Sequence, residues 1–255
     1  MTEKMFARFE KLCESFDTTM AKRDSSGIGT YNEKLLHKAL KHAICEDWGC
    51  LEVGVGAYVA DVLLDGEIFE IQTGGFYPLA KKIEYLLENT EYNITVVHPI
   101  ISELLLVRVD DGTGEIVRKK RSPKKEKPCD IFSELYYLKK LVLSERVRIW
   151  LPHISGVEYR FSERVRGRKS GAYDSVFFPE RITGFTQIST PKEVFACLPS
   201  ELRAAECFDS ATFAKAMRLR GKRASLALKF LCDIGLLTRE KDGRRYLYYI
   251  ANQRF

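Results

Sequence analysis

Three short apolar runs between residues 51 and 72 constrain this chain more than any other feature, because only tight turns fit between them. The runs are Leu51-Glu-Val-Gly-Val55, Ala57-Tyr-Val-Ala-Asp-Val-Leu-Leu64 and Glu67-Ile-Phe-Glu-Ile-Gln72. Each has the length and side-chain content of a strand. Asp65-Gly66 joins the last two, and this dipeptide is typical of a tight hairpin. We therefore expect three consecutive strands, the last two paired antiparallel.

The segments around these strands show helical spacing followed by further strands. Residues 1–23 predict an amphipathic helix, and Thr30 with Glu33 forms a capping box that would open a second helix ending near residue 45. After the third strand the pattern predicts a helix over Pro78–Glu88, then strands over Tyr92–His98 and Leu104–Val109. The predicted order from residue 28 is α-β-β-β-α-β-β.

The middle of the chain is less regular. Residues 112–128 contain a run of lysines and arginines with two prolines, which predicts a basic surface loop that faces nucleic acid or serves as a nuclear signal. A helix over Ile131–Leu143 and a strand over Val147–Leu151 are expected next. Residues 155–190 give no clear pattern, apart from a second basic cluster of Arg164, Arg166, Arg168 and Lys169.

The last 65 residues have a regular pattern. Expected helices cover Pro191–Leu198, the region near Leu202–Cys207, Ala211–Leu219 after a Ser210 cap, and Lys222–Ile234. Two strands around Lys241-Asp-Gly243 follow. This order resembles a winged helix-turn-helix, which implies DNA binding by one helix and the hairpin. The expected DNA-contacting residues are Lys222, Arg223, Ser225, Lys229, Lys241, Arg244 and Arg245. The alternative is a module of this kind used for protein contacts.

Charge is divided unevenly along the chain. Residues 1–115 carry 11 basic and 20 acidic side chains, a net of −9, and residues 116–255 carry 30 and 15, a net of +15. The two values sum to the overall +6. A basic half of this size indicates a polyanionic partner, of which nucleic acid is the commonest.

Other function classes are disfavoured by composition. No run reaches the roughly 18 apolar residues of a membrane span, and the N-terminus lacks the apolar core of a signal peptide. A cytoplasmic location and no membrane partner are therefore expected. Seven scattered cysteines do not form a disulfide framework or a zinc site.

Two carboxylates in the central hairpin carry the candidate chemistry. Asp61 lies in the second expected strand, and Glu70 lies with Gln72 in the third, where alternation places these two side chains on one face. Two acids on adjacent strands can bind one Mg²⁺ or Mn²⁺, and the Ile71 carbonyl offers a further oxygen. Glu33 on the preceding helix completes the shell directly or through water. Apolar flanks predict that the strands are buried, and a buried carboxylate needs a partner.

These residues resemble the PD-(D/E)xK nuclease superfamily. Its pattern is α-β-β-β-α-β with an acid on the second strand and Glu/Asp-x-Lys on the third, and residues 28–110 match it through Asp61, Glu70-Ile71-Gln72 and the helix acid Glu33. The resemblance implies a restriction-endonuclease-like α/β (α+β) fold, a mixed central sheet flanked by helices. It also implies metal-dependent hydrolysis of phosphodiester bonds.

Gln72 departs from that pattern, because lysine is usual there. Gln72 would then orient the attacking water while the metal acidifies it. Lys81 or Lys82, on the helix after the third strand, is a candidate for a relocated lysine that contacts the scissile phosphate. Tyr31, close to Glu33, is a further candidate for phosphate contact, although a packing role is the favoured interpretation.

The sequence therefore predicts a Mg²⁺-dependent DNA endonuclease acting on double-stranded DNA. The expected parts are an N-terminal helix at 1–27, a nuclease-like domain at 28–150, a connecting region at 151–190 and the DNA-binding domain at 191–255. A homodimer would bring the two sites that double-strand cleavage needs. The alternatives are a DNA-binding protein or regulator whose nuclease-like domain has lost its chemistry, and an RNA-processing nuclease.

Overall fold

The computed structural model describes residues 1–16, 28–110, 112–142, 144–164 and 173–251. The described side chains exclude those of residues 28–34, 162–164 and 173–174.

The central hairpins form as the sequence predicts. Three strands follow one another: β1 (Leu51–Val55), β2 (Tyr58–Leu64) and β3 (Glu67–Ile71). Asp65 and Gly66 have φ values of 49° and 77°, the left-handed conformation that a two-residue turn of the primed type requires at both positions. β1 pairs antiparallel with β2, and β2 pairs antiparallel with β3. The prediction of three consecutive strands is confirmed.

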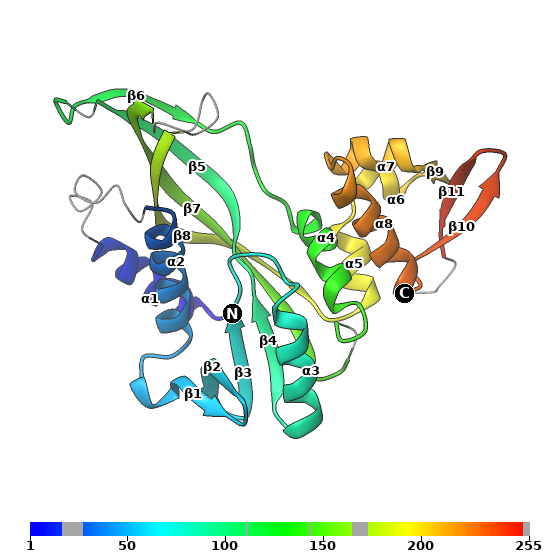
Figure 1. Cartoon of the computed structure of the whole chain (residues 1–255), viewed down its shortest axis with the longest axis horizontal. Helices are drawn as coiled ribbons and strands as arrows, with labels where there is room; N and C mark the ends of the chain where they lie inside the picture. The colour runs from blue at the N-terminus through cyan, green and yellow to red at the C-terminus, as the bar shows by residue number, and fades with distance from the viewer. Residues whose placement is uncertain (17–27, 111, 143, 165–172, 252–255) are drawn as a thin grey trace.

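A mixed sheet of eight strands grows from these hairpins (Figure 1). The order is β1-β2-β3-β4-β7-β5-β6, and β8 pairs with β7 away from this path. Parallel pairing joins β3, β4, β7 and β5, while β6 and β8 are antiparallel to their partners. The added strands are β4 (Asn93–Val97), β5 (Ile100–Val109), β6 (Ile116–Arg121), β7 (Val147–Arg164) and β8 (Tyr173–Ile188).

Helices cover both faces of the sheet, and each face has its own apolar core. Helices α1 (Glu3–Glu14) and α2 (Ile28–Ile44) contribute Phe9 and Leu40 to the core that contains Phe69 of β3. Helix α3 (Leu79–Asn89) contributes Ile83 to the other core, together with Ile68 of β3. Side chains of β3 thus alternate between two apolar layers, as period-two alternation requires. The predicted mixed sheet flanked by helices is confirmed.

The segment between residues 112 and 190 differs most from expectation. The predicted basic loop is partly strand β6, whose residues are all exposed. The predicted helix over Ile131–Leu143 is instead a series of short turns, namely a 3-10 turn at Pro128–Ile131, helix α4 at Phe132–Leu135 and a 3-10 turn at Tyr136–Leu138. The expected connecting region is wrong as well, because β7 and β8 are two long paired strands of the sheet. A boundary between residues 150 and 151 falls inside β7. Of the second basic cluster, residues 165–172 lie outside the described residues.

The C-terminal elements are four helices and a small sheet of order β10-β11-β9. They are α5 (Pro191–Cys197), α6 (Ser200–Arg203), β9 (Phe208–Asp209), α7 (Ser210–Met217), α8 (Lys222–Asp233), β10 (Leu237–Asp242) and β11 (Arg245–Ile250). The predicted succession of helix, turn, helix and hairpin is present. The cap of α7 is Asp209 rather than Ser210, because its carboxylate accepts from the N–H of Thr212.

These elements pack on the sheet domain through α4. The core that contains Ile83 continues without a break into Phe213 and Phe230 of the C-terminal helices. The ring of Phe132 in α4 contacts that of Phe230 in α8, and Lys139 is paired with Asp233.

The two N-terminal helices differ from expectation at their ends. The first helix ends at Glu14, where the sequence predicts residue 23. The second begins at Ile28, so Thr30 lies inside the helix rather than at its N-cap. Among the helices that the structure describes, none is long and apolar enough to cross a membrane.

Candidate active site

Asp61 lies where β2 separates from β3. The paired residues of these two strands extend from Leu64 only to Val62, whereas β2 pairs with β1 from Val62 to Tyr58. Opposite this point on β1, Glu52 has a φ of 51°, a strained value for a residue other than glycine. Asp61 reaches β3 through its side chain, which bonds the backbone of Ile71.

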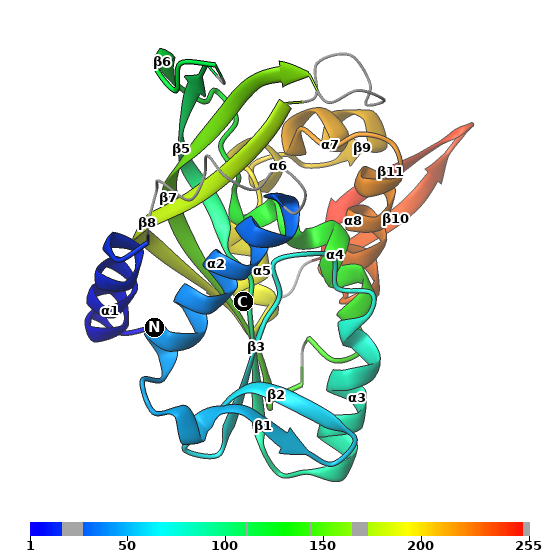
Figure 2. The same ribbon diagram turned by 60° about the vertical axis from the view of Figure 1, so that its left-hand side comes forward.

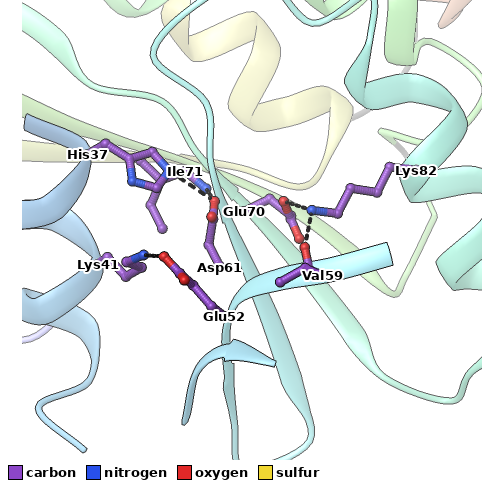
Figure 3. Close-up of polar contacts among 8 residues, drawn as sticks. All are labelled: His37, Lys41, Glu52, Val59, Asp61, Glu70, Ile71 and Lys82. Carbon is purple, nitrogen blue, oxygen red and sulfur yellow. Dashed lines mark hydrogen bonds and ion pairs between the residues drawn. The ribbon is translucent and has the colours of Figure 1, made fainter. Parts of the chain in front are cut away.

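Two donors hold the Asp61 carboxylate in place (Figure 3). Its Oδ2 accepts from the backbone N–H of Ile71 at 2.8 Å and contacts Nε2 of His37, on α2, at 3.3 Å. Burial alone would raise the pKa of Asp61, but His37, the Ile71 N–H and the charge of Lys82 outweigh it and hold the pKa below its ordinary value. Asp61 is therefore an anion at neutral pH.

Glu70 lies beside Asp61 but is more deeply buried. Its side chain is 5% exposed, and its Oε2 accepts from Nζ of Lys82 on α3 at 2.5 Å. Burial raises the pKa of Glu70 to about 7, and the charge of Asp61 adds to the rise although Lys82 opposes it. The second oxygen, Oε1, is buried with no hydrogen-bond partner among the described residues. A buried carboxylate oxygen without a partner is costly, which points to an absent positively charged or hydrogen-bonding group.

Lys82, rather than Lys81, reaches the carboxylates. Besides Glu70, its ammonium donates to the carbonyl of Val59 at 2.7 Å, so it bridges β2 and β3 at the point where they separate. Lys81 lies exposed on α3. The sequence identifies both lysines as candidates, and the structure brings Lys82 to the site (Figure 3).

The remaining predicted residues of this site lie elsewhere or outside the description. The amide of Gln72 donates to the carbonyl of Gly75 at 2.8 Å, so it holds the loop after β3. The backbone of Tyr31 and Glu33 belongs to the start of α2, but their side chains lie outside the described residues. The predicted contact of Glu33 with a metal therefore remains a prediction.

His37 is a site residue that the sequence reasoning missed. The sequence gives it no Ser or Cys partner at a recognisable spacing, which favours a structural or exposed role, and 24 residues separate it from Asp61. A signal exists in the sequence, since Glu33, His37 and Lys41 are spaced four apart and share one face of α2. The buried Lys41 completes this face by pairing with Glu52 at 2.6 Å.

A cavity of about 330 Å³ opens at the carboxyl ends of the parallel strands β3 and β4. Its wall includes the loop Thr73–Gly75 after β3, His98 after β4, Glu126 and Glu134 from the following segment, and Arg223 of α8. Leu36 of α2 also lines it, whereas the side chains of Asp61, Glu70 and Lys82 do not. Ligands of open α/β sheets bind beyond the carboxyl ends of the strands, and this cavity occupies that place.

Two carboxylates and one backbone carbonyl of this site are candidate ligands of a divalent cation. Among the described residues no group of three or more His, Cys, Asp or Glu side chains could hold a metal. Mg²⁺, however, is commonly bound through one or two carboxylates while it keeps several waters. Asp61 is anionic. Oε1 of Glu70 is buried and has no hydrogen-bond partner among the described residues, and a cation would give it one. The Ile71 carbonyl remains the third candidate oxygen, on the residue whose N–H positions Asp61.

The predicted DNA-contacting residues fall into two groups. Arg223 and Lys229 of α8 face the sheet domain, since Arg223 donates to the Asp130 carbonyl at 3.3 Å and Lys229 lies over the ring of Tyr136 at 5.2 Å. The remaining predicted contacts lie exposed at the start of α8 and in the β10–β11 hairpin, namely Lys222, Ser225, Lys241, Arg244 and Arg245. Arg245 pairs with Asp242 at 3.1 Å. The start of α8 is therefore only partly accessible to the groove of a DNA duplex.

Comparison with protein families matches residues 34–182 to the family described as Domain of unknown function (DUF8091). Comparison with curated proteins and with solved structures gives no match. The matched range contains His37, Asp61, Glu70 and Lys82, and it extends along β7 into β8. Because the match covers more than half of the 255 residues, the chain belongs to this family.

Proposed function

We propose that this DUF8091 protein is a metal-dependent nuclease of the PD-(D/E)xK type that hydrolyses phosphodiester bonds of DNA. The observation that carries the proposal is the convergence of Asp61, Glu70 and Lys82 at the point where β2 leaves β3. Two acids and one lysine are the residue types that this superfamily uses, and three different elements bring them together. Such convergence of buried charges is expected at a functional site.

Each residue has a distinct part in the proposed chemistry. Asp61 and Glu70, with the Ile71 carbonyl, would hold Mg²⁺ or Mn²⁺. The bound ion supplies Lewis-acid polarisation of the phosphate and activation of water. His37 orients Asp61 through its ring nitrogen, and the Ile71 N–H fixes the same carboxylate from the other side.

Lys82 takes the place of the lysine that is usual at position 72. Its ammonium lies at the carboxylates, and there it stabilises negative charge that develops on the phosphate. Because α3 supplies the positive charge in this way, glutamine can occupy position 72 of the motif. Gln72 keeps an indirect role, since its amide holds the loop that lines the cavity.

The C-terminal elements supply the substrate contact in this proposal. Their order of helix, turn, helix and hairpin resembles a winged helix, and Lys241 and Arg244 at the exposed hairpin are placed to meet phosphates of double-stranded DNA. Cleavage of both strands would need two sites, which a homodimer provides.

A second candidate function is a DNA-binding protein without cleavage. The observation in its favour is that Lys82 already pairs with Glu70, while the Gln72 amide bonds the loop. In that case the charged cluster would only hold the hairpin and α3 together.

One experiment separates the two functions. The full chain is incubated with supercoiled plasmid, single-stranded DNA and RNA in Mg²⁺ or Mn²⁺, beside Asp61→Asn, Glu70→Gln and the control Glu84→Gln. Glu84 is an exposed carboxylate on α3, so its loss changes the charge equally without touching the site. Metal-dependent cleavage that both site variants abolish and the control retains supports the nuclease. Duplex binding without cleavage in either metal supports the second function, and cleavage of RNA alone would make the enzyme a ribonuclease.

A further inference from the structure

Strand β6 and the segment after it carry an unusual density of positive charge. Residues 116–127 contain seven Lys or Arg and one acid, Glu126, so their net charge is 7 − 1 = +6. This equals the net charge of the entire chain. All six residues of β6 are exposed, and β6 is the last strand on its side of the sheet.

The register of the sheet arranges part of this charge in a row. Arg118 of β6 lies opposite Arg108 of β5, and Arg108 lies opposite Arg160 of β7. Residues that pair in this way share a face of the sheet, so three arginines cross three adjacent strands side by side. Because neighbouring strands are about 4.8 Å apart, the row spans about 10 Å.

This row is costly for the sheet itself. Like charges directly opposite each other destabilise a strand pair. The next row on the same face contains Lys120 and Glu158, and Glu158 binds Arg160 through two contacts of 2.9 and 3.2 Å. Among the described residues of these two rows four side chains are basic and one is acidic, a formal charge of 4 − 1 = +3. Charged side chains on an edge strand discourage aggregation, which accounts for the charges of β6 but not for Arg108 and Arg160 on the inner strands β5 and β7. The row therefore favours an anionic partner.

We infer that the exposed strand β6, together with Arg108 and Arg160 beside it, forms a second binding surface, which contacts the phosphate backbone of duplex DNA away from the cleavage site. Phosphates along one strand rise by about 3.4 Å each, so a row of about 10 Å covers about three of them. The inference rests on the proposed function for the identity of the polyanion. The DNA would then be contacted at two ends of the molecule, because β6 and the β10–β11 hairpin lie at opposite ends (Figure 1). The β1–β2 hairpin lies at the other end of the sheet from β6, so the new surface is separate from the proposed cleavage site (Figure 2).

The salt dependence of binding tests this surface. The full chain carries Asp61→Asn, which prevents cleavage of the DNA. This protein is titrated onto a duplex of about 40 base pairs at KCl concentrations from about 50 to 200 mM. The same measurement is made after adding Arg118→Gln and Lys120→Gln together. Loss of two phosphate contacts should reduce the slope of log K against log [KCl] by about 1.8.

The matched control adds Lys4→Gln and Lys11→Gln, which remove the same charge from exposed positions of α1. Its slope should equal that of the parent. An unchanged slope for the β6 variant, an equal fall in the control, or no measurable duplex binding would each overturn the inference. Thermal unfolding of all variants checks that they are folded. Wild-type cleavage is measured separately, so a reduced slope without any cleavage would retain this surface and reject the nuclease.

Discussion

The candidate active site and strand β6 are both rich in charge, but they hold it in opposite ways. At the site, charges of both signs are largely buried, and Glu70, Lys82 and Asp61 each have a partner from another element. On β6 the charges have one sign and are exposed. Burial forces pairing, because an isolated charge inside a protein is costly. Exposed charges, in contrast, can remain of one sign, and such a surface attracts a partner of the opposite charge.

The largest effect should follow from removing the positive charge of the site. Lys82→Ala should lower the cleavage rate by about 100- to 1,000-fold, the usual cost of losing one group that stabilises a transition state. Lys81→Ala, an exposed neighbour on the same helix, should leave the rate unchanged. Single-turnover cleavage at saturating Mg²⁺ measures both. Equal effects of the two variants would contradict the assignment of Lys82.

The second effect concerns stability and pH. Because the pKa of Glu70 is raised from 4.5 to about 7 in the folded protein, folding favours the protonated form. Its stabilising contribution is complete below pH 4.5 and is lost as pH rises through 7. The stability of metal-free Glu70→Gln relative to wild type should therefore rise by roughly 2 kcal/mol between pH 5 and pH 8, on top of the pH-independent cost of losing the pair with Lys82. Urea unfolding in EDTA at pH 5 and pH 8 measures this change, and a stability difference between the two proteins that is the same at both values would contradict the prediction.

A smaller effect is expected at His37. Its contact with Asp61 is 3.3 Å, and loss of a group that orients a metal ligand weakens metal binding by about tenfold or somewhat more. His37→Ala should raise the Mg²⁺ concentration for half-maximal cleavage accordingly. His42→Ala on the same helix is the control, because His42 packs against Trp48 instead. The prediction fails if the rate falls while the Mg²⁺ requirement stays the same.

The smallest effect is expected for Arg223. Its two contacts, to the Ser133 hydroxyl and the Asp130 carbonyl, measure 3.4 and 3.3 Å at an exposed side chain. Arg223→Ala should lower the free energy of unfolding by less than about 1 kcal/mol and leave the salt slope of duplex binding unchanged. A slope reduced by about one would show that Arg223 contacts a phosphate after all.

The order of elements up to residue 109 was predictable because local signals determine it. Alternating apolar residues and the Asp65-Gly66 turn define the hairpin without any distant contact. Strand β6 was not predictable in this way, since an exposed edge strand needs no apolar face and its lysines resemble those of a loop. Likewise β7 obtains its length from pairing with β5 and β8, partners that are distant in sequence.

The candidate site was predictable in part for the same reason. Asp61 and Glu70 are close in sequence and lie on one hairpin, so their proximity follows from the turn. The choice between Lys81 and Lys82 depends on how α3 is rotated against the sheet. The contact of His37 depends on how α2 packs, and no periodicity within either helix determines that packing.

The length of β7 has a consequence for substrate size. Its 18 residues extend for about 60 Å at 3.3 Å per residue, and they pass from the centre of the sheet to β5, the strand beside β6, without an intervening loop. Register shifts in its pairing with β8 mark bulges, which bend the strand locally. A DNA duplex that lies along the whole of β7 would need on the order of 15 to 20 base pairs, because it rises about 3.4 Å per base pair.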